Sequence, residues 1–270
     1  ADLIFRLAWA AKPRTALVTA PTFAEYAAAL ESAGCAVRRH FLQAEVDFAV
    51  TDSILSSITP EVDMVFLCQP NNPTGQLTPL PLVERILRRC EACGALLVVD
   101  ECFLDFLPDC DALTAKALLD SKNLLILKAF TKLYGMAGVR LGYCLCANTA
   151  LLEAMQAAGQ PWAVSSLAQA AGLAALDETA YVAQVRALIA QQRPRLTAGL
   201  RALGLRVLDG RANYLLFQGP ETLGDALRQW GVVLRSCSNY PGLDGSWYRT
   251  AVRTGPENDE LLKTLAEVLA

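Results

Sequence analysis

Two apolar segments, ALLVVDE (residues 95–101) and NLLILKAF (residues 123–130), decide the fold class. Each is apolar along most of its length, whereas a strand with one wet face alternates polar and apolar residues. Helical patterns alternate with such strands through the first two thirds of the chain. Strands that are buried on both faces and separated by helices indicate an α/β protein with a mostly parallel, doubly wound sheet.

The alternation extends outward from these two segments in both directions. A helix at the start of the chain runs into Lys12 and Pro13, and Gly34 and Gly94 suit left-handed helix caps. Thr51 and Asp52 are expected to cap a further helix. The expected strands are 15–21, 36–42, 64–70, 95–101, 123–130 and 139–146, and the expected helices are 23–34, 51–58, 79–94 and 148–159.

The pattern changes after the stretch GQPW, residues 159–162. A long helical region is expected from about residue 165 to residue 203. Strands are then expected at 212–218, 232–238 and 247–254, before a closing helix that begins at Pro256. We therefore expect a large domain over residues 1–165, and a linking helix with a small α+β domain over residues 166–270.

Composition narrows the function classes. The 270 residues are 53% hydrophobic and 19% charged, which excludes intrinsic disorder. The formal net charge of −3 argues against a basic face for nucleic acid, and no apolar run reaches the roughly 20 residues that span a bilayer. The single histidine, His40, excludes a multi-histidine metal site. We expect a cytoplasmic enzyme with no metal, no nucleic-acid partner and no membrane partner.

Nine cysteines lie in mostly apolar surroundings, which is typical of small buried side chains in a reducing compartment. Cys90 and Cys93 form a C-x-x-C pattern on the helix expected at 79–94, but no second pair at zinc spacing accompanies it. A metal or redox role for this pair is therefore disfavoured.

The opening residues read as part of a domain already begun, so we expect an N-terminal segment to be absent.

Four segments at the ends of the expected strands carry unusual polar residues, and ligands bind at the carboxyl ends of strands in sheets of this kind. Asn72 lies in the stretch PNNPTG (residues 70–75), which a simple turn would also explain. Two carboxylates, Asp100 and Glu101, end an apolar strand and need partners there. Lys132 could form an imine if burial lowers its pKa, although a solvated lysine is the alternative. Arg140 suits a phosphate.

Taken together, these groups call for a cofactor with a carbonyl, a cationic ring nitrogen and a phosphate. Pyridoxal phosphate has all three, and the pairing of a lysine with its carbonyl and an aspartate with its ring nitrogen is the usual binding rule. The sequence therefore predicts Lys132 and Asp100 as catalytic residues of a pyridoxal-phosphate site.

The stretches FLCQPNNPTG, VVDECFLDF, FTKLYGMAGVRLGY and YRTAVR resemble the fold-type I pyridoxal-phosphate enzymes of the class I/II aminotransferase superfamily, and the likeness extends over the whole chain. The resemblance implies that Asn72 contacts the cofactor ring hydroxyl and Phe23 stacks on the ring. It also implies that Arg249 binds the substrate α-carboxylate. The remaining residues that it places around the cofactor are Ala1, Asp2, Asp100, Thr131, Lys132 and Arg140.

The finer pattern, including LRSCSNYPGLDGSWYRTAVRT, is most similar to the threonine-phosphate decarboxylases of cobalamin biosynthesis, a group close to the histidinol-phosphate aminotransferases. This likeness implies that Arg235 binds the phosphate of a small phosphorylated amino acid, and that the enzyme is a homodimer. It implies decarboxylation of L-threonine O-3-phosphate to (R)-1-aminopropan-2-yl phosphate. Two alternatives stay open: a 2-oxoglutarate-dependent histidinol-phosphate aminotransferase, and a non-catalytic fragment of the fold.

Two positions depart from the family pattern. Ala129 stands where relatives carry a serine that binds the cofactor phosphate. Loss of the serine's hydrogen bond is expected to cost about 1.5–3 kcal/mol of cofactor binding free energy unless another group replaces it. Lys128 is the candidate replacement. Phe103 stands where many relatives have a tyrosine, although the decarboxylases also have phenylalanine there. The glycine-rich turn and the partner-reaching arm that precede Ala1 in relatives are the segment expected to be absent.

Overall fold

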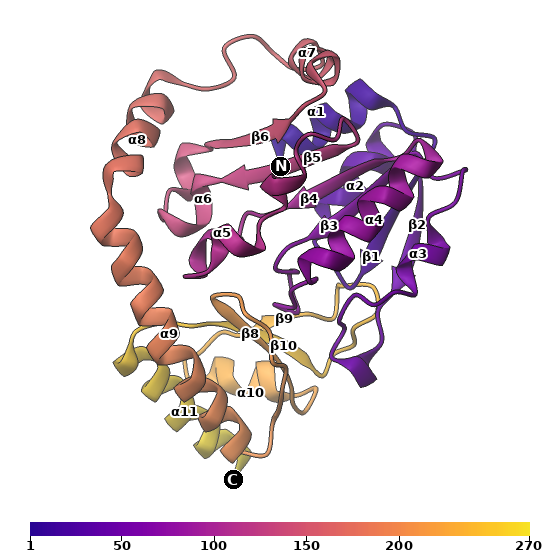
Figure 1. Ribbon diagram of the computed structural model, residues 1–270. Coiled ribbons are helices and arrows are strands. Elements are labelled where there is room, and N and C mark those ends of the chain that lie inside the picture. The colour runs from indigo at the N-terminus through magenta and orange to yellow at the C-terminus, as the bar shows by residue number, and fades with distance from the viewer.

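The computed structural model describes residues 1–270. A six-stranded sheet in the order β2-β1-β3-β4-β5-β6 lies at the centre of the larger part of the molecule (Figure 1). Every neighbouring pair is parallel except β5 and β6. The mostly parallel sheet expected from the sequence is confirmed. Its strands are β1 (Thr15–Ala20), β2 (Ala36–Phe41), β3 (Met64–Cys68), β4 (Leu96–Asp100), β5 (Leu124–Ala129) and β6 (Gly142–Cys146).

Helices cover both faces of this sheet. Leu97 and Val99 point to one face and join a core with helix α4 (Leu80–Cys93), whereas Val98 points to the other face, where α1 (Asp2–Ala11) and α2 (Glu25–Ser32) pack. This double burial explains why β4 is apolar throughout. The other helices of this part of the chain are α3 (Ile54–Ser57), α5 (Cys110–Leu113), α6 (Phe130–Leu133) and α7 (Thr149–Ala157).

A second, antiparallel sheet in the order β7-β8-β10-β9 lies below the first in Figure 1. Helices α8 (Ser166–Asp177) and α9 (Thr179–Ala202) run along one side of the molecule and lead from the first sheet to the second. The second sheet packs with α9, α10 (Leu223–Gln229) and α11 (Gly255–Leu269) around a separate apolar core. Its strands are β7 (Arg206–Val207), β8 (Tyr214–Gln218), β9 (Arg235–Ser236) and β10 (Trp247–Ala251).

Several expected boundaries are wrong. The helix expected over 51–58 is only four residues long, and the Thr51 hydroxyl bonds the Ser53 hydroxyl instead of capping a helix N–H group. The strand expected over 232–238 shrinks to β9, because Val233 is 74% exposed and its apolar character does not reflect burial in a sheet. The strand expected over 123–130 ends at Ala129, where α6 begins.

The cysteines are all unpaired. Cys90 is fully buried in the core beneath α4, and burial raises the pKa of its thiol to about 12. None of the helices combines the length and the apolar character that a bilayer crossing needs.

Candidate active site

The carboxyl ends of β3, β4 and β5 converge on a cavity of about 480 Å³. This volume lies in the range of about 300–1,000 Å³ that is typical of small-molecule sites. The structure brings together at this cavity every residue that the sequence placed around the cofactor. They are Ala1, Asp2, Phe23, Asn72, Asp100, Thr131, Lys132 and Arg140.

Asp100 ends β4 and is only 6% exposed. Its carboxylate accepts a hydrogen bond of 2.6 Å from the Tyr26 hydroxyl and one of 3.0 Å from the Cys102 backbone N–H. Burial, together with the charge of Asp100, raises the pKa of Tyr26 well above its usual range, so the phenol stays a donor. Asp100 takes part in none of the ion pairs of the structure. A buried carboxylate without a cation is costly, and a protonated ring nitrogen would supply the missing charge.

Lys132 lies on α6, three residues after the end of β5. Its side chain is exposed, so the expectation that burial desolvates and thereby activates this lysine is wrong. The Nζ atom lies 5.3 Å from the centre of the Phe103 ring. Lys132 and Phe103 also line a second, larger cavity, so the lysine stands where the two cavities meet.

The remaining groups around the first cavity suit a phosphate. The backbone at Ala1 and Asp2 forms the N-terminus of α1, where N–H groups and the helix dipole favour an anion. Arg140 has a left-handed backbone (φ 59°), and its exposed guanidinium donates a 2.9 Å hydrogen bond to the Ala137 carbonyl. Thr131 lines the same cavity.

Lys128 does not replace the serine that Ala129 displaces. Its ammonium is buried and already held by Glu101 at 3.0 Å and Asp105 at 2.8 Å. The suggestion that Lys128 compensates by binding phosphate is therefore wrong, because both of its charge partners belong to the protein.

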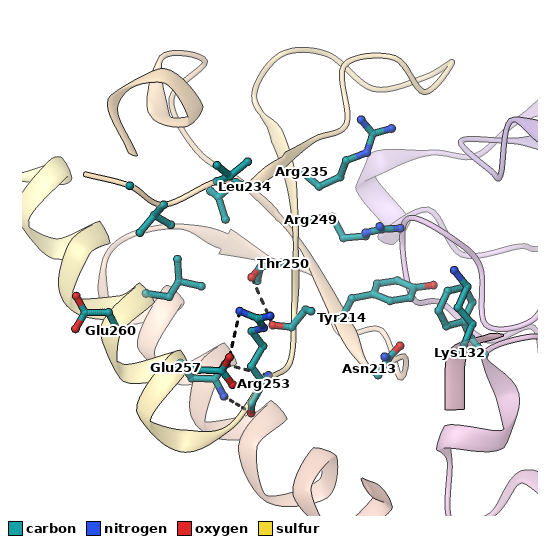
Figure 2. Close-up of a pocket in the computed structure, with 17 residues that line it drawn as sticks. Lys132, Asn213, Tyr214, Leu234, Arg235, Arg249, Thr250, Arg253, Glu257 and Glu260 are labelled. Carbon is teal, nitrogen blue, oxygen red and sulfur yellow. Dashed lines mark hydrogen bonds and ion pairs between the residues drawn. The ribbon is translucent and has the colours of Figure 1, made fainter. Parts of the chain in front are cut away.

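The second cavity has a volume of about 730 Å³ and reaches the second sheet (Figure 2). Arg249 on β10 lies directly opposite Arg235 on β9 in the antiparallel register. Figure 2 shows the Arg249 and Tyr214 side chains extending toward Lys132. Like charges directly opposite on neighbouring strands are destabilising, and neither arginine has a carboxylate partner. The pair is therefore suited to an anionic ligand.

The immediate partners of the two arginines are neutral. Arg249 donates to the Asn72 side-chain oxygen, and its guanidinium lies 5.1 Å from the centre of the Tyr214 ring. Arg235 donates a 3.0 Å hydrogen bond to Asn239 and lies 5.7 Å from the Tyr240 ring centre. Neutral partners orient the guanidinium groups and leave their charge available.

A close backbone crossing brings Asn72 to the second sheet. Gly75 has a positive φ of 73°, and a Cβ atom on Gly210 would lie 2.6 Å from the Thr74 carbonyl oxygen. The Arg211 N–H donates a 2.6 Å hydrogen bond to the Gly75 carbonyl at this crossing. Glycines allow the two segments to touch, so the loop after β3 reaches Arg249 of β10.

Sequence reasoning missed four residues that either line the two cavities or contact a residue that lines them. Tyr26 holds Asp100, Tyr214 lies under Arg249, and the Tyr240 hydroxyl contacts Asn72 at 3.3 Å. Arg6 lines the first cavity although its side chain is buried. Tyr26 comes only three residues after Phe23, and the two rings are in edge contact, so its short distance in the sequence from Phe23 could have indicated its place. The other three come together only through tertiary contacts.

Asp100 and the first cavity fit pyridoxal phosphate. The cavity has a suitable volume, a buried carboxylate without a cation at one part of its wall, and a helix N-terminus with Arg140 at another. Lys132 is within the same wall and is free of ion pairs. The protein therefore supplies a carboxylate for the ring nitrogen, an amine for the carbonyl, and a helix N-terminus with Arg140 for the phosphate.

Comparisons with known proteins agree with this fit. The family model described as aminotransferase class I and II matches residues 1–266. A threonine-phosphate decarboxylase of Salmonella typhimurium is 39% identical over 99% of this chain and 74% of its own length. A histidinol-phosphate aminotransferase of Lactiplantibacillus plantarum is 33% identical over 94% of this chain and 70% of its own length.

A solved structure has the same architecture. The crystal structure of a histidinol-phosphate aminotransferase from Clostridium acetobutylicum has a TM-score of 0.93 and 27% identity, over 99% of this chain and 81% of that one. The chain belongs to the class I and II aminotransferase family, whose members are pyridoxal-phosphate-dependent enzymes.

Proposed function

We propose that this protein decarboxylates L-threonine O-3-phosphate to (R)-1-aminopropan-2-yl phosphate, a step of cobalamin biosynthesis. The observation that carries the proposal is the register pair of Arg235 and Arg249, which faces the cavity of Lys132 without any carboxylate partner. The substrate carries a phosphate and a carboxylate, so one ligand neutralises both arginines. The 39% identity to a threonine-phosphate decarboxylase supports the same choice.

The cofactor and the protein divide the chemistry. When bound, pyridoxal phosphate supplies a carbonyl that accepts an amine and a ring that withdraws electrons from the substrate Cα. Asp100 supplies the negative charge that keeps a proton on the ring nitrogen. Lys132 supplies the amine for the carbonyl and, once free, an Nζ atom that can carry the proton that replaces CO2 at Cα.

Orientation of the substrate decides which bond breaks. Arg249, held by Asn72 and packed over Tyr214, is placed to grip the carboxylate, and Arg235 to grip the phosphate. The way in which Arg249 holds the carboxylate would decide whether CO2 or the α-proton leaves Cα. Two fixed anion contacts can set this orientation, and a well-set orientation accounts for much of the rate in such reactions.

The second candidate is a histidinol-phosphate aminotransferase, supported by the 33% identity to such an enzyme. Its phosphorylated substrate has no carboxylate, so Arg249 would instead bind the carboxylate of the amino-group acceptor. A third candidate is a non-catalytic member of the fold, motivated by Ala129, which offers no hydroxyl to the cofactor phosphate.

We further propose a homodimer in the cytoplasm. Trp162 is 96% exposed, and α8 exposes the apolar side chains of Leu167, which is 81% exposed, Leu173 and Leu176. Apolar surface of this kind is typical of protein interfaces, and a second copy of the chain is the proposed partner. The nine free cysteines support a reducing compartment. Measurement of the molar mass in solution, with Leu173→Lys as the disrupting variant, tests the dimer.

The deciding experiment uses the protein loaded with pyridoxal phosphate and supplies L-threonine O-3-phosphate without any 2-oxo acid. Stoichiometric release of CO2 supports the decarboxylase. Unphosphorylated L-threonine serves as the matched substrate and should react far more slowly, because Arg235 then has no anion to bind. Turnover of histidinol phosphate that depends on 2-oxoglutarate, without CO2 release from the first substrate, would establish the aminotransferase instead.

A further inference from the structure

A cluster of three charged side chains lies beside the cofactor cavity and has no part in the proposed chemistry. The Lys128 ammonium lies 3.0 Å from the Glu101 carboxylate and 2.8 Å from the Asp105 carboxylate. The side chains of Lys128 and Glu101 are 2% and 0% exposed, and that of Asp105 is 32% exposed. Lys128 also lines the cavity itself.

Each member of this cluster is close in the chain to a residue of the cofactor site. Glu101 directly follows Asp100, and Asp105 comes two residues after Phe103. Lys128 lies on β5, four residues before Lys132. The strand ends that carry them are neighbours in the sheet, with Asp100 opposite Leu127. One ammonium therefore connects the three chain segments that carry Asp100, Phe103 and Lys132.

Further hydrogen bonds fix the two carboxylate-bearing residues. Glu101 accepts 2.7 Å bonds from the Thr114 hydroxyl and the Ala115 N–H. The Asp105 backbone carbonyl accepts a 3.0 Å bond from Arg186 of α9. Burial lowers the pKa of Lys128, but the two carboxylates raise it by more, so its net pKa is raised and the ammonium persists at neutral pH.

A buried ion pair contributes little net stability compared with apolar side chains of similar volume. Its geometry, however, is directional, since each oxygen must meet an N–H group. We infer that Lys128, Glu101 and Asp105 are positioning residues that hold Asp100, Phe103 and Lys132 in the arrangement that binds the cofactor. The inference rests on the proposed function only through the cofactor site and is independent of which substrate reacts.

Asp105→Asn is the most informative variant, because it removes one of the two carboxylate charges beside Lys128. The buried ion pair of Lys128 and Glu101, which has no net charge, is left in place. The double variant Lys128→Met/Glu101→Gln removes the buried charges together. We expect both to bind pyridoxal phosphate about tenfold more weakly, as followed by the visible absorption of the bound cofactor. Both should keep the unfolding midpoint of the native cofactor-free protein nearly unchanged.

Two further variants serve as controls. Lys128→Arg keeps a cation that can reach both carboxylates and should retain cofactor affinity within about twofold. Asp109→Asn removes a carboxylate nearby in the chain that pairs with Arg211 at 2.8 Å and does not line the cavity, and it should behave like the native protein.

Hydrogen exchange of the cofactor-free protein provides a readout that does not depend on loading. Faster exchange at residues 100–106 and 128–133 in Asp105→Asn, but not in Asp109→Asn, supports the inference. Native cofactor affinity and native exchange rates in folded Asp105→Asn would overturn it. Weak cofactor binding by the native protein together with the altered exchange in Asp105→Asn would contradict the proposed function and leave the positioning cluster supported.

Discussion

The arginine pair of the second sheet and the lysine cluster of the first sheet use charge in opposite ways. Lys128 is buried and meets two carboxylates of the protein, whereas Arg235 and Arg249 lie opposite each other and have only neutral side chains as hydrogen-bond partners. The lysine cluster is satisfied within the protein. The arginine pair is satisfied only when an anion arrives.

This difference separates residues that hold the site from residues that bind the ligand. Removal of a charge should affect folding where it leaves a buried partner without any counter-ion. A charge without internal partners should affect ligand binding and leave folding intact. The four predictions below test this contrast.

The largest effect is expected for Lys132→Ala, which removes the one lysine of the first cavity that has no carboxylate partner. Loss of its proton-transfer role alone should lower turnover by about 10²- to 10⁴-fold, and the absorption of the cofactor imine should disappear. Absorption spectra and CO2 release measure the two effects. Lys122→Ala, an exposed lysine outside both cavities, is the matched control. Native spectra in Lys132→Ala would contradict the assignment of this lysine.

Lys128→Met should have the largest effect on stability. It leaves Glu101 as a buried charge without a counter-ion, which costs about 3–5 kcal/mol of unfolding free energy. Urea denaturation measures the loss, and adding Glu101→Gln should restore most of it. Arg85→Ala breaks an ion pair with Asp52 whose side chains are 50% and 64% exposed, and should cost less than about 1 kcal/mol. Equal losses of unfolding free energy in Lys128→Met and Arg85→Ala would contradict the distinction between buried and exposed charge pairs.

Arg249→Gln and Arg235→Gln should each weaken kcat/KM for the phosphorylated substrate by about 10- to 100-fold, from loss of a charge-assisted contact worth about 1.5–3 kcal/mol. Arg235→Gln should also reduce the preference for phosphorylated over unphosphorylated threonine. Stability should stay constant or rise slightly, because the like-charge pair is relieved. A large loss of unfolding free energy would show instead that the arginines, like Lys128, stabilise the fold.

His40→Gln should give the smallest effect and extends the comparison to a neutral cluster. The His40 ring contacts the hydroxyls of Ser57 at 3.0 Å and Ser53 at 3.2 Å, and burial lowers its pKa. The unfolded chain therefore binds a proton near pH 6.5 before the folded chain does. Stability should fall slightly as the pH drops below about 6.5, and urea titrations at several pH values should show a smaller fall in His40→Gln.

The sequence determined the succession of strands and helices along the first sheet and, with the family resemblance, eight residues of the cofactor cavity, but not Tyr26 and Arg6. Local patterns were sufficient there, because β4 is apolar on both faces and the polar residues follow the strand ends directly. It was less reliable at 51–58 and 232–238, where a short apolar run does not show whether a segment is paired, exposed or helical.

Only the tertiary structure decided how the charges are partnered. Lys128 and Lys132 are four residues apart, yet one is buried between two carboxylates and the other is exposed at the meeting of two cavities. The facing of Arg235 and Arg249 depends on strand register, and the contact of Arg249 with Asn72 depends on the glycine crossing at Gly75 and Gly210. Burial and charge pairing are properties of three-dimensional neighbours, and these neighbours come from segments far apart in the chain.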